Sequence, residues 1–187
     1  AGRANKALAS EVHSLGGKAI GLSGRDGGLL TGEAISEALG RVGRVTSVRT
    51  EALEMCAERG FVPIVCSVAA DAEGNALNVN ADSAAAALAG ALNAAKLVLL
   101  TDTDGVYGDA DKPETLISRL TPAQAREMVR TGRASRGMIP KLEAAMQALE
   151  ERVPSVHLIN GARANALLIE IFTDQGVGTM LAEASGA

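Results

Sequence analysis

The chain has 187 residues, enough for one domain with a sizeable core, and carries a net charge of −4. That charge argues against non-specific binding to nucleic acid, and no apolar run reaches the length of a transmembrane helix. One Tyr, two Phe and no Trp predict an aliphatic core. Cys56 and Cys66 are the only cysteines and lack metal-ligand spacing, which favours reduced thiols in a cytoplasmic protein.

Helices and strands are predicted to alternate along the chain. Apolar residues recur at helical spacing in the opening segment, which ends at Gly16-Gly17, and again at 51–59, 81–92, 121–129, 140–150 and 164–172. Strand-like runs lie at 18–23, 61–69, 96–101, 155–160 and 178–181, with a hairpin across 29–48. The nearly continuous apolar runs at 61–69 and 96–101 predict strands buried on both faces. The alternation predicts a single α/β domain over residues 1–187, with a mainly parallel sheet between helices.

Polar loops follow several of the predicted strands. They cover residues 23–28, 102–107 and 160–163. Ligands of open α/β sheets bind outside the carboxyl ends of the strands, so these loops are candidates for a binding site.

The run N-V-N-A-D at 78–82 places polar side chains at the start of a predicted helix. The carboxamides of Asn78 and Asn80 can hold a substrate's amide or carboxylate, and Asp82 is an acid in the first helical turn. By itself, the motif is explained more simply by an N-cap at Asn80 followed by a first-turn acid.

Two further segments carry groups suited to phosphate chemistry. The loop D-T-D-G at 102–105 offers backbone N–H groups to a phosphate and carboxylates to ribose or hydrated Mg²⁺, or it is a solvated turn. In R-G-M-I-P-K at 136–141, Pro140 suits the first turn of a helix, where the macrodipole disfavours the cation of Lys141. A lysine at a helix N-terminus indicates an anion site, although an exposed lysine at the start of a helix is an equal alternative.

Four motifs in order resemble the amino acid kinase family. They are N-V-N-A-D (78–82), L-L-T-D-T-D-G-V-Y (99–107), G-M-I-P-K (137–141) and E-I-F-T-D-Q-G-V-G-T-M (170–180). The resemblance covers essentially the whole chain and is closest to the branch that acts on N-acetyl-L-glutamate in arginine biosynthesis. It implies a carbamate kinase-like fold and transfer of phosphate from ATP to the γ-carboxylate of that substrate. Mg²⁺ would be held mainly through the phosphates, with no metal site made by the protein.

The resemblance also implies roles for individual residues. Lys141 would stabilise the transferring phosphoryl group, Asp82 would orient catalytic lysines, and Asn78, with Asn80, would bind the substrate. Nucleotide contacts would come from Thr101, Asp102, Thr103, Gly105, Val106, Tyr107, Arg133, Ser135, Gly137 and Met138. Arginine, a feedback inhibitor of many members, would contact His157, Glu170 and Gly176.

The chain departs from the family pattern at its start. Members carry a lysine and paired-glycine loops that hold the phosphates, and no K-x-G-G occurs here before Asn78. We therefore expect the N-terminal part of the fold to be missing and the 187 residues to be nearly inactive alone, as one part of a homo-oligomeric enzyme. An aminoadipate or other acylamino-acid kinase, and a non-catalytic module that senses nucleotide or arginine, are the alternatives.

Overall fold

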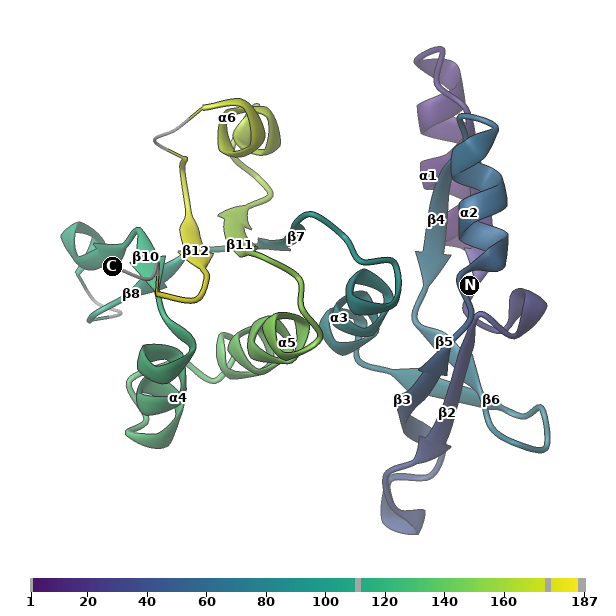
Figure 1. The fold of residues 1–187 in the computed structure, drawn as a ribbon, viewed down its shortest axis with the longest axis horizontal. Helices are drawn as coiled ribbons and strands as arrows, with labels where there is room; N and C mark the ends of the chain where they lie inside the picture. Colours follow the sequence, from purple (N-terminus) through teal and green to yellow (C-terminus); the bar gives the residue numbers. More distant parts are fainter. Residues whose placement is uncertain (1, 110–111, 174–175, 185–187) are drawn as a thin grey trace. The chain divides into compact units, whose positions relative to one another are not determined.

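The computed structural model describes residues 2–109, 112–173 and 176–184 (Figure 1). The chain divides into two compact units, residues 1–91 and 92–187, and each is described by itself. The expectation of a single domain stays a prediction. Within the described ranges, none of the helices combines the length and apolar character that crossing a membrane requires.

The first unit combines three helices with two small sheets. Its elements are α1 (Arg3–Ser14), β1 (Ala19–Ser23), η1 (Asp26–Gly28), β2 (Leu30–Ala34), η2 (Glu37–Leu39), β3 (Val42–Val48), α2 (Glu51–Glu58), β4 (Val62–Cys66), β5 (Val68–Ala70), β6 (Ala76–Val79) and α3 (Ala81–Ala91), where η marks a 3-10 helix.

β1 and β4 form a parallel pair on which α1 and α2 pack. The buried Asn5 of α1 joins the two strands, because its Nδ2 donates to Leu22 O at 3.2 Å and to Ile64 O at 2.6 Å. Gly21 lies under this side chain, and a Cβ there would overlap Asn5 Oδ1. The α1–β1–β4 packing therefore depends on a small residue at position 21.

β2, β3, β6 and β5 close into a small barrel. β2 and β3 pair antiparallel, which confirms the hairpin predicted across residues 29–48. β6 alternates exposed and buried residues and leads directly into α3, which packs on β3. The core of this unit is aliphatic, as predicted, and consists of Leu29, Leu30, Leu53, Ala69, Leu77, Val79 and Ala84.

The apolar run at 61–69 is two strands rather than one, and neither is buried on both faces. Among the described residues, β4 pairs with β1 alone, whereas β5 belongs to the barrel. Val62 of β4 is 54% exposed, so this strand is not covered on both faces. The prediction of one fully buried strand here is wrong, since hydrophobicity alone does not reveal how many neighbours a strand has.

The second unit is built on a four-stranded sheet. Its elements are β7 (Leu97–Thr101), β8 (Val106–Tyr107), η3 (Pro113–Thr115), β9 (Leu116–Ile117), β10 (Arg119–Leu120), α4 (Pro122–Arg130), α5 (Ile139–Glu150), β11 (Val156–Asn160), α6 (Ala166–Phe172) and β12 (Thr179–Leu181).

The strand order is β10–β12–β11–β7, and only the β11–β12 pair is antiparallel. Figure 1 shows α6 on one face of this sheet and α4 and α5 on the other. β11 is central and buried, whereas β7 is an edge strand on which Leu100 is 57% exposed. The run at 96–101 is therefore a strand, as predicted, but it is not buried on both faces. The α/β fold class, with parallel strands between helices, is confirmed.

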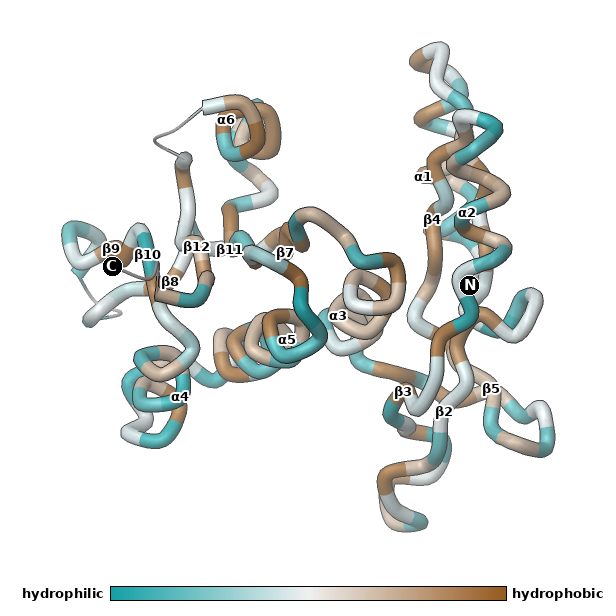
Figure 2. Tube along the Cα trace, in the orientation of Figure 1, coloured by the Kyte–Doolittle hydropathy of each residue, from teal (hydrophilic) through white to brown (hydrophobic). Residues whose placement is uncertain are grey.

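Local sequence signals fix the start of α4. Thr121 is the N-cap, in a capping box with Gln124, and Pro122 occupies the first turn. Figure 2 shows hydrophilic colour over much of α4 and hydrophobic colour along α6. Four of the five large apolar side chains of α6 are exposed and the fifth, Ile169, is half-buried, while Glu170 is buried. This inverted pattern indicates that Glu170 is held by specific polar contacts.

Candidate functional site

Two polar loops meet at the carboxyl ends of β7 and β11. Thr101 and Asn160 are partners in the parallel register, so the loops that follow them are adjacent. Asn160 Nδ2 donates to Asp104 Oδ1 at 2.9 Å, and Asn160 Oδ1 accepts from Ala162 N at 2.9 Å. The predicted placement of loops 102–107 and 160–163 at the carboxyl ends of two strands is confirmed.

A cavity of about 150 Å³ lies beside this loop pair. Its lining comes from two segments about 30 residues apart: Thr103, Gly105, Val106, Tyr107, Arg133, Ala134, Ser135 and Met138. All but three of the residues predicted to contact nucleotide line it. The other three are Thr101, which is buried at the end of β7, and the exposed Asp102 and Gly137. We call this cavity the loop pocket.

α5 begins directly after the loop pocket. Met138 lines the pocket and is also the N-cap residue of α5, where no side chain caps the helix. Pro140 and Lys141 lie in the first turn, as predicted. A helix N-terminus that lacks a side-chain cap presents backbone N–H groups, and Lys141 adds a positive charge to it.

The N-V-N-A-D motif lies in the first unit, where β6 ends and α3 begins. Asn80 Oδ1 accepts from Ser83 N at 3.1 Å, so Asn80 is the N-cap of α3. Asp82 is half-buried in the first turn, and the side chain of Asn78 is exposed on β6. The capping role is therefore present, and roles for these residues toward a substrate stay predictions.

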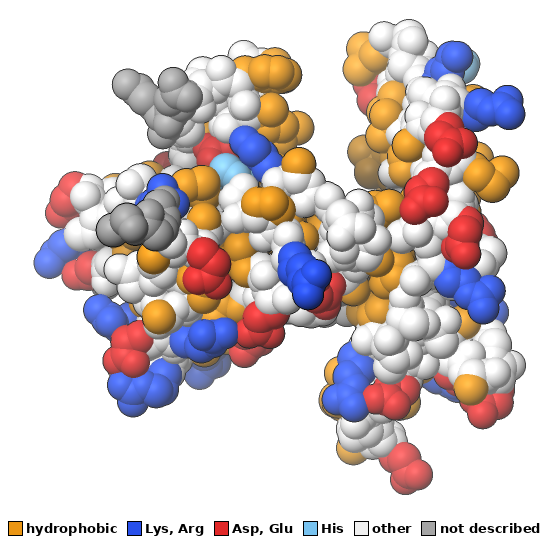
Figure 3. All heavy atoms as spheres, viewed as in Figure 1, with side chains coloured by type: hydrophobic (Ala, Val, Ile, Leu, Met, Phe, Trp, Pro, Cys, Tyr) orange, Lys and Arg blue, Asp and Glu red, His pale blue; other side chains and the backbone are white. Residues whose placement is uncertain are grey.

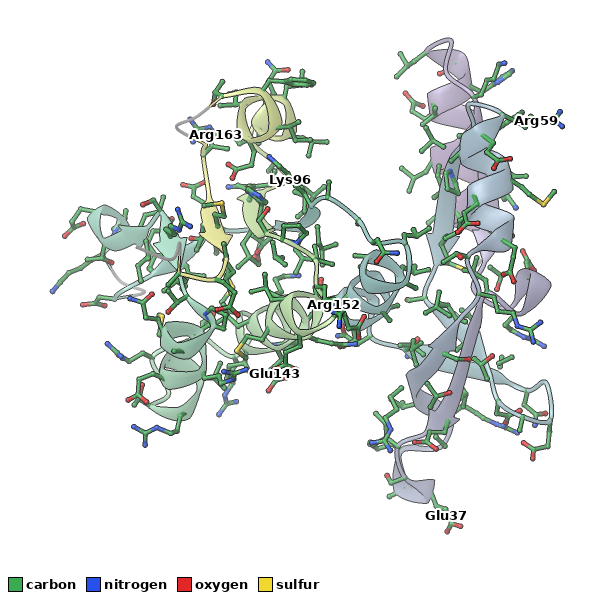
Figure 4. All side chains as sticks on the ribbon, in the orientation of Figure 1. Glu37, Arg59, Lys96, Glu143, Arg152 and Arg163 are labelled. Atoms are coloured by element: carbon green, nitrogen blue, oxygen red, sulfur yellow. The ribbon has the colours of Figure 1, made fainter. Side chains whose placement is uncertain are left out.

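A second cavity, of about 370 Å³, lies on the α6 side of the second unit. We call it the α6 pocket, and its lining residues are Lys96, Ser118, Arg119, His157, Glu170, Thr173, Gly176, Gly178 and Met180. It brings together the three residues predicted to contact arginine. Figure 3 shows basic, acidic and histidine side chains gathered below α6, and Figure 4 shows Lys96 there.

Glu170 is the centre of a buried hydrogen-bond network in the α6 pocket. Its carboxylate is 2.6 Å from His157 Nδ1 and accepts from Val177 N at 2.6 Å. Ser155 Oγ lies 3.0 Å from His157 Nε2 on the other side of the ring. Burial opposes ionisation, but these hydrogen bonds and the coulombic attraction of His157 outweigh it and lower the pKa of Glu170 below its ordinary 4.5.

Gly176 makes room for this carboxylate. Its φ is +60°, and a Cβ there would lie 2.8 Å from Glu170 Oε2. Glycine adopts this backbone conformation without steric cost, whereas any other residue is disfavoured. The sequence motif G-V-G-T-M therefore includes a residue whose small size the Glu170 network requires.

Several residues of these sites were not predicted individually. Ala134 of the loop pocket and Lys96 and Arg119 of the α6 pocket lie outside the predicted motifs. Asp104 and Asn160 belong to two of the predicted polar loops, but their hydrogen bond to each other was not predicted. Within the described ranges, no three His, Cys, Asp or Glu side chains gather as a metal site would require.

The fold is that of a family of kinases. The sequence model of the amino acid kinase family matches residues 1–160, and the chain belongs to that family. The chain is 46% identical to the acetylglutamate kinase of Methanocaldococcus jannaschii over 97% of its length, and 46% identical to that of Synechococcus sp. over 96%. It spans 64% and 60% of the length of these two relatives.

Solved structures share the fold. N-acetylglutamate synthase from Neisseria gonorrhoeae, complexed with coenzyme A and L-arginine, matches with a TM-score of 0.73 and 29% identity. The match covers 88% of this chain and 38% of that one.

Proposed function

We propose that the protein transfers phosphate from ATP to the γ-carboxylate of N-acetyl-L-glutamate, in arginine biosynthesis and in the cytoplasm. The observation that carries the proposal is the loop pocket, whose lining unites two segments expected to contact nucleotide. The similarity to two acetylglutamate kinases supports the choice of substrate. The two free cysteines support a reducing compartment. Assembly into a homo-oligomer stays a prediction.

Phosphoryl transfer requires mainly that the two substrates are positioned and that the negative charge of the phosphates is neutralised. The substrate carboxylate is already ionised near neutral pH, so no general base is needed. Lys141, at the start of α5, would stabilise negative charge on the transferring phosphoryl group. Asn78 and Asn80 would hold the substrate, and Asp82 would orient cations. Mg²⁺ bound through the phosphates would neutralise part of their charge.

The loop pocket predicts nucleotide binding by the 187-residue chain. Arg133→Ala should raise the Kd for MgATP at least about tenfold, since a charge-assisted hydrogen bond contributes about 1.5–3 kcal/mol. Calorimetric titration with MgATP measures this. Arg130→Ala is the matched control, because Arg130 is exposed, pairs with Glu127 and does not line the pocket. Failure of the unaltered chain to bind millimolar MgATP would contradict the nucleotide assignment.

A second function, arginine sensing, is favoured by the α6 pocket. Its basic, acidic and glycine residues suit a ligand with both a carboxylate and a guanidinium. The structural relative solved with L-arginine supports this choice.

Arginine binding can be tested with a closely matched ligand. L-Arginine should bind the chain measurably, whereas L-citrulline, which replaces the guanidinium with a neutral ureido group, should bind at least about tenfold more weakly, because the charged hydrogen bond is lost. Calorimetric titration with both ligands measures the difference. Equal affinities would count against a guanidinium site.

The substrate alternatives differ only in the acid that is phosphorylated. The rate of ADP release with N-acetyl-L-glutamate and with N-acetyl-L-aminoadipate separates the proposed kinase from an aminoadipate kinase. Turnover is measured in the full-length enzyme, because the 187 residues are expected to be nearly inactive alone. Nucleotide or arginine binding by that enzyme without turnover of either acid would favour the non-catalytic module.

A further inference from the structure

The hydroxyl of Thr179 connects three strands of the second unit. Thr179 lies on β12 and is fully buried. Its Oγ1 accepts from Val106 N at 2.8 Å and donates to Ile117 O at 2.6 Å. Val106 belongs to β8 and Ile117 to β9, so one hydroxyl ties both strands of this hairpin to β12.

The hairpin is short. Among the described residues, β8 and β9 share two residue pairs, Val106 with Ile117 and Tyr107 with Leu116, and Gly108 N donates to Thr115 O at 2.9 Å. An isolated two-stranded hairpin is at best marginally stable in water. The two hydrogen bonds to Thr179 therefore help to hold it, together with the backbone bond from Met180 N to Ser118 O just after β9.

The same hairpin forms a wall of the loop pocket. Val106 and Tyr107 line that pocket, and so does Gly105, which packs directly against Thr179. A Cβ at Gly105 would lie 2.5 Å from Thr179 Oγ1, so the hydroxyl also depends on a glycine in the D-T-D-G loop. A side chain that does not line the pocket itself thus supports the position of the pocket wall.

We propose that Thr179 is a positioning residue for nucleotide binding, which it supports by holding the β8–β9 hairpin at the wall of the loop pocket. This inference rests on the proposed use of the loop pocket for ATP. It gives the G-V-G-T-M motif a role distinct from the contacts of Gly176 with Glu170.

Two substitutions of Thr179 distinguish the effect of its hydroxyl on nucleotide binding from the effect of its side-chain size. Thr179→Val keeps the shape but removes both hydrogen bonds, and Thr179→Ser keeps the hydroxyl. Circular dichroism first establishes that each variant is folded, and calorimetry then measures its Kd for MgATP. The Kd should rise at least about tenfold in Thr179→Val, because two backbone groups lose their hydrogen-bond partner. Thr179→Ser should stay within about threefold of the unaltered chain, since its hydroxyl can make both bonds.

Hydrogen exchange at the Val106 amide gives an independent measurement that needs no substitution. We expect this amide to exchange slowly in the unaltered chain and more slowly still when MgATP is bound. Rapid exchange in the presence of bound MgATP would overturn the proposal, even if Thr179→Val failed to fold.

The outcomes separate this inference from the function on which it rests. If the unaltered chain does not bind MgATP, the proposed function and the positioning role both fail. If it binds MgATP and folded Thr179→Val binds within threefold of it, only the positioning role fails. An equal rise in the Kd for MgATP in Thr179→Ser would also overturn the positioning role, because loss of the hydroxyl could then not explain the weaker binding.

Discussion

Replacing Glu170 with alanine is expected to lower the free energy of unfolding by about 3–5 kcal/mol, because it breaks a buried, hydrogen-bonded pair and leaves its partners unsatisfied. Glu170 and His157 are 7% and 4% exposed, and the carboxylate also accepts from Val177 N. Urea unfolding at pH 7, followed by circular dichroism, measures the change.

The matched control is an exposed ion pair in the same unit. Glu127 pairs with Arg130 on the surface of α4, so Glu127→Ala should cost no more than about 1 kcal/mol. If Glu170→Ala and Glu127→Ala lowered the free energy of unfolding by similar amounts, the buried network would not be important for stability. If Glu170→Ala fails to fold, Glu170→Gln tests the same contacts with a side chain of the same shape.

The lowered pKa of Glu170 also predicts a dependence of stability on pH. Its hydrogen bonds and His157 favour the ionised form, so its stabilising contribution is complete above the unfolded value of about 4.5. That contribution is lost as the pH falls through the lower pKa of the folded state. Glu170→Gln cannot ionise, so its stability should fall less between pH 5 and pH 3, a range set by the direction of the shift. If the free energy of unfolding fell equally with pH in the unaltered chain and in Glu170→Gln, the contribution assigned to ionised Glu170 would be contradicted.

Replacing Lys141 with alanine is expected to lower the rate of phosphoryl transfer by about 10²–10³, equivalent to about 2.7–4 kcal/mol of transition-state stabilisation. The lysine lies in the first turn of α5, beside the loop pocket that Met138 lines. Its positive charge would be needed most as negative charge shifts between the transferred group and the leaving ADP. ADP release by the full-length enzyme with MgATP and N-acetyl-L-glutamate measures the rate, because the 187 residues are expected to be nearly inactive alone.

Folding should be nearly unaffected by this substitution, which separates catalysis from stability. A cation near a helix N-terminus is slightly unfavourable, so Lys141→Ala should leave the free energy of unfolding within about 0.5 kcal/mol. Arg136→Ala is the control for charge, because Arg136 is an exposed cation just before α5. A rate loss below about tenfold in Lys141→Ala would remove Lys141 from the catalytic role.

Much of the local structure could be predicted from patterns of neighbouring residues. The capping box at Thr121, the proline in the first turn of α5 and the glycine that ends α1 are all short-range signals, and the structure contains each of them. The polar loops were found for a similar reason, because they follow apolar strands directly. Burial was harder to predict, as Val62 and Leu100 illustrate, because it depends on which strands lie next to each other.

By itself, the sequence determined the α/β class, the order of helices and strands, the family resemblance and the motifs that carry candidate chemistry. Only the tertiary structure decided that residues about 30 positions apart share the loop pocket, and that His157 and Gly176 lie against the carboxylate of Glu170. It alone revealed the bonds from Thr179 to Val106 and Ile117. The physical reason is that local motifs depend on short-range backbone geometry, whereas these contacts depend on strand pairing between segments far apart in the chain.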